Sequence, residues 1–507
     1  MDKRFRNILI PGLLVLLSLI VSLSYVSYTN SRIGNFTFPL DDAWIHLTFA
    51  RNLARHHSLS YHPDLPSTSG STAPFYTMIL AIGFLFVENE FLLGGGASLL
   101  FFLGSVVLFH TVCRKLFPRG IWLPFCLSLL FATEWRLLWS SISGMETTLF
   151  IFFLLFSLYF LTLSGKRGWY LSGLFLGIGI WIRPEVLILA FPVAFYLLIE
   201  RKHSRGDIGG FALCFLIPAF GYLLFNLFLS GTPLPNTFYA KGAFYRGFSR
   251  MEYLGDAIRF FLQAPLVPLL PFYLLCLIDA GKSLLKGKVE IQTLVAIFPL
   301  LLIGAYLWRI PLLFERGRYI QPCLPFFLLG AGFSIERLWN TLKAGKREKI
   351  AALVAGILIM AVSLGSAVSH RLHYCSDARL ILFRHVKTAA WVRDHVPKGE
   401  TIAAHDIGAL GYYSGHPLLD LAGLIDPGAI RLMDAPEKQA RLLREKGVHY
   451  LVIALDWKQF HPLLKSLPRR HLFPPRDKYA PPFRPMEVFY IDPGKPQPDP
   501  KSPEKNT

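Results

Sequence analysis

The chain has 507 residues, of which 53% are hydrophobic and only 17% are charged, and its formal net charge is +19 at pH 7. A soluble domain of this length needs far more polar surface, so the composition indicates an integral membrane protein. The basic residues gather at the ends of apolar runs, as membrane topology requires, and no RNA-binding motif accompanies them. We therefore expect membrane lipids, and no nucleic acid, among its partners.

The first apolar run, from Ile8 to Tyr28, follows a basic start and is long enough to cross a bilayer. No A-x-A cleavage site follows it, which favours a signal anchor with a cytoplasmic N-terminus. The later runs of spanning length are 97–113, 121–139, 147–163, 169–183, 185–199, 209–230, 259–279, 291–310, 319–335 and 350–369. The pattern predicts an α-helical polytopic membrane protein with about eleven transmembrane helices.

The stretch 74–93 decides the topology, because it is apolar but contains Pro74, Glu88 and Glu90. If it lies in the outer leaflet as an interfacial helix, every Lys/Arg cluster between spans falls in the cytoplasm. If it crosses the membrane, all of these clusters move outside. The positive-inside rule therefore predicts a multi-pass protein of the cell (inner or plasma) membrane whose N-terminus is cytoplasmic and whose C-terminal domain is extracytoplasmic.

The sequence after Ser369 is polar and changes its periodicity. It predicts a helix over 378–395, a strand and glycine-rich turn from Glu400 to Leu410, and a buried strand from Val448 to Leu455. We expect a transmembrane domain over 1–369, a small extracytoplasmic α/β domain over 370–490, and a disordered tail over 491–507.

Three acids stand at the expected outer ends of spans. Asp41 and Asp42 follow the first span, and Glu146 begins a later one. Carboxylates are costly against lipid and useful in a wet cavity, so these residues are candidates for chemistry. Structural alternatives stay open: one of the first two caps the helix that follows, and Glu146 lies favourably on a helix dipole.

Cations lie on the same expected face. Lys241, Arg316 and Arg318 suit a ligand phosphate, whereas snorkelling at the interface is the alternative for each of them. Arg183 and Glu185 form a tight joint and are expected to pair with each other. The loop 59–74, rich in Ser, Thr, Pro and Gly, is either a polar connection or an ordered cradle beside a ligand.

The run DDAWIHLTFARNLARHHSLSYHPDLPSTSGSTAPFYTMIL is similar to the first outer loop of polyprenyl-phosphate-sugar-dependent glycosyltransferases of the GT-C fold. That clan includes protein O-mannosyltransferases and aminoarabinose transferases. SGMETTLF, WIRPEVL, GTPLPNTFYAKG, RYIQPCLPFF and HDIGALGYYSGHPLLDLAGLIDP follow in the order of one branch, the mycobacterial terminal arabinofuranosyltransferases and their bacterial relatives. The resemblance spans nearly the whole chain.

The resemblance implies a helical bundle with juxtamembrane helices. It also implies inverting transfer of a hexosyl or pentosyl group from a polyprenyl-phosphate sugar to a hydroxyl of an envelope glycan, lipid or protein. Asp41 matches the catalytic acid position of the family and Asp42 matches its neighbour. Thr48 stands where many relatives have Arg, and Ser69 where several have Glu. The donor phosphate would then have to be bound by Arg51, Lys241, Arg316 or Arg318.

We expect Asp41 to act as the base, with Asp42 and Glu146 orienting it or the acceptor. The segment from His405 to Tyr413 is expected to roof the cavity, with Asp406 or Tyr412 toward the acceptor. No cofactor is required for such a displacement, and a divalent metal at the paired acids is a further option.

Two other function classes are carried as alternatives. A lipid-linked-sugar transporter or flippase would need charges within spans, and Glu134 with Arg136 are the only hints of these. A non-catalytic membrane scaffold or sensor would use the C-terminal domain to bind a ligand.

Overall fold

The computed structural model describes residues 3–163, 165–199, 204–245, 247–341, 346–433, 435–473 and 484–492. The tail expected to be disordered lies, beyond Asp492, outside the described residues. The contacts divide the chain into two compact units. The first comprises Met1–Phe36, Asn89–Phe225 and Tyr245–Cys375, and the second comprises Thr37–Glu88, Asn226–Phe244 and Ser376–Thr507.

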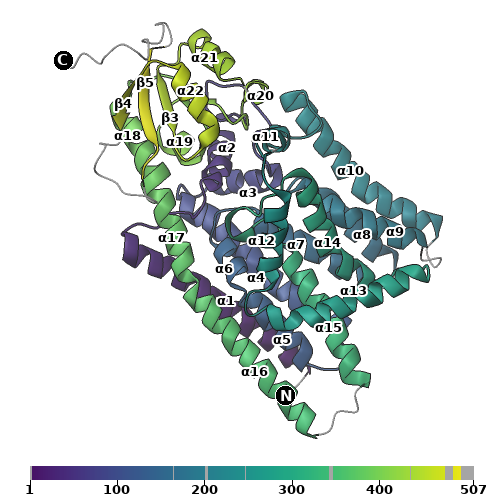
Figure 1. The fold of residues 1–507 in the computed structure, drawn as a ribbon. Coiled ribbons are helices and arrows are strands. Elements are labelled where there is room, and N and C mark those ends of the chain that lie inside the picture. Colours follow the sequence, from purple (N-terminus) through teal and green to yellow (C-terminus); the bar gives the residue numbers. More distant parts are fainter. Residues whose placement is uncertain are drawn as a thin grey trace. The chain divides into compact units, whose positions relative to one another are not determined.

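The first unit is helical, and its α-helices are labelled in Figure 1. Its long helices are α1 (Lys3–Ile33), α4 (Glu90–Leu116), α10 (Arg205–Ser230, whose last residues belong to the second unit), α13 (Leu270–Leu285), α14 (Ile291–Arg309), α15 (Cys323–Thr341) and α16 (Lys346–Ser369). Its shorter elements are α5 (Trp122–Ala132), α6 (Trp135–Ser141), α7 (Thr147–Leu161), α8 (Lys166–Gly179), η1 (Pro184–Val186), α9 (Leu187–Ile199), α12 (Arg250–Phe261), η2 (Val267–Leu269) and η3 (Glu315–Gly317).

The chain is a multi-pass membrane protein. Within its described part, six helices are long and apolar enough to cross a membrane, and four shorter apolar helices accompany them. The count of eleven spans and the side on which each terminus lies stay predictions.

The sequence predicted a single helix over 74–93, but the structure has two helices there. The first, α3 (Pro74–Phe84), has 11 residues and is too short to cross a bilayer alone, since it rises only about 16 Å. The second is α4, which begins at Glu90 because the Asn89 side chain caps it by accepting the backbone N–H of Leu92 at 2.9 Å.

Two expected spans also have different bounds. The run 121–139 divides into α5 and α6, because the side chain of Glu134 caps a new helix there. The run 259–279 divides into α12 and α13, and three prolines, Pro265, Pro268 and Pro271, fall at the break, where their missing N–H groups cannot continue a helix.

The second unit joins the first loop to the C-terminal region. Its helices are α2 (Asp42–His56), α3, α11 (Asn236–Phe244), α17 (Arg371–Ile381, which begins in the first unit), the π-helical turn η4 (Leu382–Val386), α18 (Lys387–His395), α19 (Gly408–Tyr413), α20 (Pro427–Ile430), α21 (Pro436–Glu445), η5 (Lys458–Phe460) and α22 (His461–Ser466). Its strands are β1 (Ile402–Ala404), β2 (Leu418–Asp420), β3 (Tyr450–Ile453), β4 (Arg469–Phe473) and β5 (Glu487–Ile491).

The strands form one sheet in the order β2-β1-β3-β5-β4. The pairs β1–β2 and β1–β3 are parallel, whereas β3–β5 and β4–β5 are antiparallel. The helix expected over 378–395 and the strands expected within 400–410 and 448–455 are present, and the α/β prediction for this region is confirmed. The glycine-rich turn expected before Leu410 is instead the start of helix α19.

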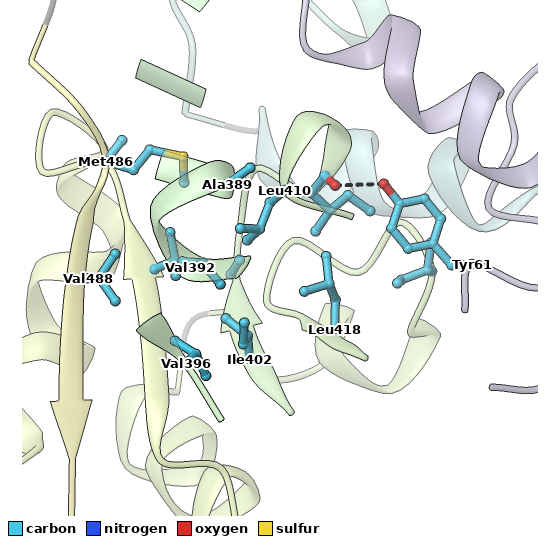
Figure 2. Packing of buried hydrophobic residues seen from close by; sticks show 14 of the residues in the cluster. Tyr61, Ala389, Val392, Val396, Ile402, Leu410, Leu418, Met486 and Val488 are labelled. Carbon is cyan, nitrogen blue, oxygen red and sulfur yellow. Dashed lines mark hydrogen bonds between the residues drawn. The ribbon is translucent and has the colours of Figure 1, made fainter. Parts of the chain in front are cut away.

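One face of this sheet shares its core with the first loop. Ile45 and Phe49 of α2 are buried with Val392, Ile402 and other residues of the C-terminal region. Figure 2 shows this packing, including the hydroxyl of Tyr61, which donates to the backbone oxygen of Ile407 at 2.6 Å. The loop after the first span is thus built into the α/β fold rather than beside it.

Candidate active site

Asp41 lies directly before α2, and its side chain is 13% exposed. Its Oδ2 accepts the backbone N–H of Gly408 and its Oδ1 accepts that of Ala409, each at 2.8 Å. These are the first two residues of α19, and such N–H groups have no partner within their own helix. The helix dipole also favours an anion at this end. The C-terminal region therefore holds the Asp41 carboxylate in place.

Burial raises the pKa of Asp41 to about 6. The two backbone N–H groups oppose this rise, and the negative charge of Asp42 adds to it. The Nδ1 atom of His385, in η4, lies 3.6 Å from Oδ1, and burial lowers the pKa of this histidine to about 4. Asp41 is thus mostly ionised at pH 7, yet it is basic enough to accept a proton.

Gly408 is required by the closeness of Asp41. A Cβ atom on Gly408 would lie 2.0 Å from the backbone oxygen of Asp41 and 2.6 Å from its Cγ. Both distances are shorter than any normal contact, and one involves backbone that cannot rotate away. Any larger residue at this position must displace either α19 or the carboxylate.

Asp42 faces a cation. Its Oδ2 lies 3.9 Å from Nζ of Lys241, and the two side chains are 31% and 17% exposed. Lys241 belongs to α11, whose first residue, Asn236, donates from Nδ2 to the hydroxyl of Thr68 at 2.8 Å. The hydroxyl of Ser69 donates to that of Ser230 at 2.7 Å. Of the two interpretations of loop 59–74, these contacts favour an ordered segment, and it positions the lysine.

Arg51 contacts Tyr412. Its Nη2 donates to the backbone oxygen of Tyr412 at 3.0 Å, and its guanidinium carbon lies 4.0 Å from the centre of that ring. The arginine is therefore held as a cation over an aromatic face. A phosphate at Arg51 would have to share the guanidinium with this contact.

His405 is buried between the rings of Trp457 and Phe460. Its Nε2 lies 3.4 Å from Oδ2 of Asp406, and burial lowers the pKa of this histidine. The side chain of Asp406 is 22% exposed, against 1% for His405. Asp406 is thus the member of the pair that a ligand can reach, and His405 packs beneath it.

The first unit contains a second charged cluster, around Arg183. Its Nε donates to Oε1 of Glu146 at 2.9 Å, and its Nη1 donates to the hydroxyl of Tyr306 at 3.3 Å. The same tyrosine hydroxyl donates to Glu185. Arg183 also lies 3.8 Å from Glu185, so the expected pair is present, but its closer carboxylate partner is Glu146.

Arg318 is buried beside this cluster. Its guanidinium carbon lies 5.5 Å from the ring of Tyr319 and 5.6 Å from that of Phe314. The ring of Tyr319 also faces Arg183, at 5.0 Å. Arg316 has a φ of 54°, in the left-handed region that side chains other than glycine rarely adopt. The short η3 segment thus contains a strained Arg316, and Arg318 follows it directly.

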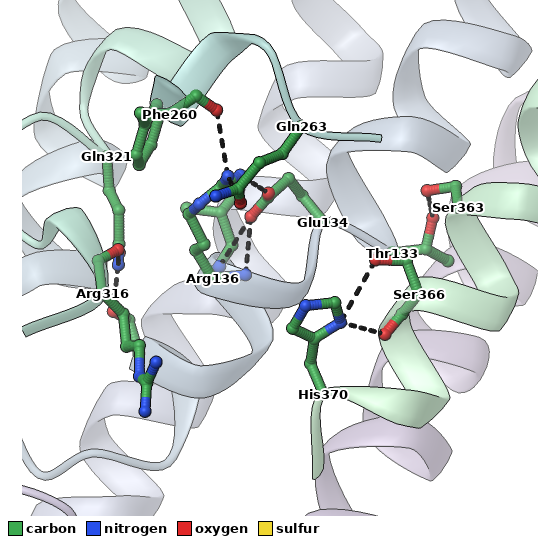
Figure 3. Close-up of polar contacts among 12 residues, drawn as sticks. Thr133, Glu134, Arg136, Phe260, Gln263, Arg316, Gln321, Ser363, Ser366 and His370 are labelled. Carbon is green, nitrogen blue, oxygen red and sulfur yellow. Dashed lines mark hydrogen bonds and ion pairs between the residues drawn. The ribbon is translucent and has the colours of Figure 1, made fainter. Parts of the chain in front are cut away.

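The charges near the start of α6 form a closed group, shown in Figure 3. Arg136 donates to the Glu134 carboxylate at 2.5 Å, to the backbone oxygen of Phe260 at 2.9 Å and to the side-chain oxygen of Gln263 at 2.5 Å. The Glu134 carboxylate also accepts the backbone N–H groups of Arg136 and Leu137. An arginine and a glutamate that satisfy each other in this way are explained by local structure.

Comparisons with solved structures identify the fold. The crystal structure of ArnT from Cupriavidus metallidurans bound to undecaprenyl phosphate matches with a TM-score of 0.61 at 12% identity, over 94% of this chain and 98% of that one. The apo state of the same protein matches with a TM-score of 0.57 at 13% identity, over 94% and 97%. The chain has the GT-C fold.

A further solved structure, a family model and the curated proteins were also compared with the chain. The mycobacterial arabinofuranosyltransferase AftD matches with a TM-score of 0.47 at 17% identity, over 97% of this chain and 41% of that one. Residues 377–489 match a family described as a domain of unknown function (DUF8728). No curated protein matches the sequence.

Within this GT-C fold, the expected site residues belong to two groups. The second unit holds Asp41, Asp42, Lys241, Arg51, His405, Asp406 and Tyr412, and the first holds Glu146, Arg316 and Arg318. Asp41 and Asp42 lie with Lys241 and the C-terminal region, whereas convergence of Asp41 with Glu146 stays a prediction. Sequence reasoning missed His385 and Tyr306. Neither lies in a quoted motif, and only their distant partners make them notable.

The donor atoms around the paired acids do not fit a divalent metal well. Both oxygens of Asp41 accept backbone N–H groups, and Asp42 faces an ammonium group. A hard cation prefers a shell of oxygen ligands. Among the described residues, no group of three or more His, Cys, Asp and Glu side chains could hold a metal ion.

Proposed function

We propose that the chain transfers a sugar from a polyprenyl-phosphate-linked donor to an acceptor hydroxyl of an envelope glycan, lipid or protein, on the extracytoplasmic side. The observation that carries the proposal is the Asp41 carboxylate, which two backbone N–H groups anchor and which comes eight residues after the end of α1. A GT-C fold supports it, because one structure with this fold is described as bound to undecaprenyl phosphate.

The reaction is a single displacement. The acceptor oxygen forms a bond to the anomeric carbon of the donor, and the bond from that carbon to the phosphate oxygen breaks. The acceptor proton passes to a carboxylate oxygen of Asp41, and the bonding electrons leave with the polyprenyl phosphate. One base is enough for such an inverting step, and retaining hydrolases differ because they also need a carboxylate nucleophile.

The leaving phosphate gains negative charge in the transition state, so cations placed near it lower the barrier. Lys241 is our first choice for this role, because it already lies 3.9 Å from Asp42 in the same unit as the base. Arg316 and Arg318 of the first unit are further candidates. Arg51 is the weakest of the four, since it is already committed to Tyr412.

The other acids have supporting roles in the proposal. Asp42 holds Lys241 until a donor phosphate competes for it. Glu146 is a positioning residue in the proposal rather than a second base, because its buried carboxylate holds Arg183. Asp406 lies just before α19 and has an accessible carboxylate. In the proposal, Asp406 and Tyr412 bind hydroxyl groups of the acceptor. No step uses a metal.

The transporter alternative loses its one specific support, because the Glu134–Arg136 pair is closed by local hydrogen bonds. The deciding experiment uses the full-length chain in detergent, where no membrane separates two compartments. A lipid extract that contains polyprenyl-phosphate sugars serves as donor, and envelope material from a deletion strain serves as acceptor.

We expect transfer of the sugar with release of polyprenyl phosphate, and loss of both in Asp41→Asn. The deletion strain should accumulate the polyprenyl-phosphate sugar and make a truncated envelope glycan. A transporter would also cause accumulation in cells, but it would form no product in detergent. Absence of product from folded wild-type protein, with accumulation of the donor in the deletion strain, would therefore overturn the proposed transferase activity.

A further inference from the structure

A groove in the first unit lies between α9, α13 and α14 and has a volume of about 630 Å³. Its residues on α9 are three or four apart and share one helix face, and those on α14 have a similar spacing. The lining is entirely apolar: Ile188, Phe191, Pro192, Phe195, Leu284, Val289, Leu294, Ile297 and Leu301. In a membrane protein, hydrocarbon fills such a groove, because water gains no hydrogen bonds there.

The length of the groove along α14 falls within one leaflet of a bilayer. From Leu294 to Leu301 the chain advances seven residues, about 10 Å along α14. The hydrocarbon core is about 30 Å thick, so one leaflet accounts for about half of this. Phe191 is 71% exposed and Leu301 is 43% exposed, so no other part of the described chain covers the mouth of the groove there. It is shaped for a chain that enters from one leaflet.

Three lysines lie close in sequence to the residues that line one end of this groove. Lys282, Lys286 and Lys288 are exposed, and each is within four residues of the lining residue Leu284. A lysine at the end of α13 suits the helix dipole, but that explains only one of the three. Together they form a positive rim at an apolar opening.

The acids on either side of this rim are already engaged. Asp279 pairs with Arg337, and the Glu290 side chain accepts the backbone N–H of Thr293 in the capping box of α14. Among the described residues, no carboxylate lies within ion-pair distance of the three lysines. The charge of the rim is therefore left for a ligand that arrives from outside the protein.

We propose that this groove binds one anionic phospholipid, with an acyl chain between α9 and α14 and its phosphate among Lys282, Lys286 and Lys288. Basic residues at the end of an apolar inter-helical groove are what such a lipid requires, since the tail and the headgroup are satisfied at once. The inference does not depend on the proposed glycosyl transfer.

The test is native mass spectrometry of the full-length protein in detergent, titrated with phosphatidylglycerol or with phosphatidylcholine of the same acyl chains. We expect preferential binding of phosphatidylglycerol. In the variant Lys286→Gln/Lys288→Gln its affinity should fall about thirty-fold, because each lysine near a lipid phosphate contributes about five-fold. Phosphatidylcholine binding should not change. Arg347→Gln/Lys349→Gln, in exposed basic residues at the start of α16, is the matched control.

A second variant examines the groove itself. Leu301→Trp fills it without touching a charge, so binding of phosphatidylglycerol should fall although the three lysines remain. Equal retention of the two lipids, or an equal loss in the Arg347/Lys349 control, would reduce the site to unspecific lipid contact and overturn the proposal. Displacement of phosphatidylglycerol by equimolar polyprenyl phosphate would also overturn it, by assigning the groove to the donor.

Discussion

The Asp41 carboxylate accepts N–H groups with both oxygens. Asparagine at this position keeps the shape of the side chain and one of these hydrogen bonds, but its NH2 group can accept neither the second N–H nor a proton. We expect Asp41→Asn to remain folded and to lose transfer by about a hundred- to ten-thousand-fold, the usual cost of removing a general base. The rate of product formation in detergent measures this. Asp42→Asn should lose less, because Asp42 holds Lys241 rather than the proton.

Asp64→Asn is the control for these two changes. Asp64 lies in the same loop, but its side chain is 82% exposed and its ion-pair partner is His62. We expect wild-type activity. Full activity in Asp41→Asn would end the assignment of Asp41 as the base.

The pKa of Asp41 predicts how transfer depends on pH. Burial raises this pKa to about 6, so the carboxylate is protonated, and unable to act as a base, below that value. We expect kcat/KM to rise about tenfold per pH unit up to pH 6 and to level off above about pH 7. His385 should add no second inflection there, since its pKa is lowered to about 4. A profile that is flat from pH 5 to 8 would contradict the base assignment.

At the scale of elements, a side chain at Gly408 should break the hydrogen bonds by which the start of α19 holds Asp41. The Cβ of Gly408→Ala would clash with the Asp41 backbone, and overpacking of this kind costs about 1–3 kcal/mol. We expect a lower unfolding temperature and a large loss of transfer. Gly255→Ala is the control, because its Cβ meets no atom within 4 Å. Wild-type behaviour of Gly408→Ala would show that the α19 contact is not needed.

The Glu146–Arg183 pair offers a separate prediction, which distinguishes pairing from catalysis. Glu146→Gln leaves a buried arginine without its closest carboxylate, which typically costs about 3–5 kcal/mol. Replacing both residues in Glu146→Leu/Arg183→Leu should restore much of the thermal stability, since an apolar pair is often as stable as a buried ion pair. We expect this folded double variant to remain inactive. Recovery of transfer would limit Glu146 to a structural role.

For the whole molecule, patterns in the sequence predicted where helices and strands lie better than they predicted which distant residues contact one another. Apolar runs and their period located the helices, and the run at 448–455 located β3, because local composition decides both. Asp41 and Gly408 are 367 residues apart, and nothing in either motif says that they meet. The same holds for Glu146 with Arg183. Contacts between residues far apart in the sequence are visible only in the folded structure. The sequence therefore identified the acids as candidates, but it did not show which of them is a base and which forms an ion pair.

Breaks within apolar runs were the other difficulty. Hydropathy alone gave 74–93 as one helix, but Asn89 caps a new helix and Leu85 to Glu88 turn the chain. A cap outweighs apolar composition, because it satisfies N–H groups that would otherwise be buried without partners.

The last prediction concerns the side of the membrane on which the turn between α3 and α4 lies. The two-helix arrangement over 74–93 leaves Glu88 and Glu90 at a turn, and Glu88 forms an exposed pair with Arg55 at 2.5 Å. Only an outer position for this turn keeps the basic clusters of the later loops in the cytoplasm. A cysteine at position 90 should therefore react with a membrane-impermeant maleimide in intact cells.

The matched inner position is Lys286, in the turn after α13. Lys286→Cys should react only after the cells are permeabilised, because its lysine-rich turn is predicted to be cytoplasmic. The six native cysteines are buried or partly buried, so the parent chain gives the background to subtract. Labelling of position 90 only after permeabilisation would reverse the topology. The Asp41 site would then face the cytoplasm, and acceptors outside the cell would be excluded.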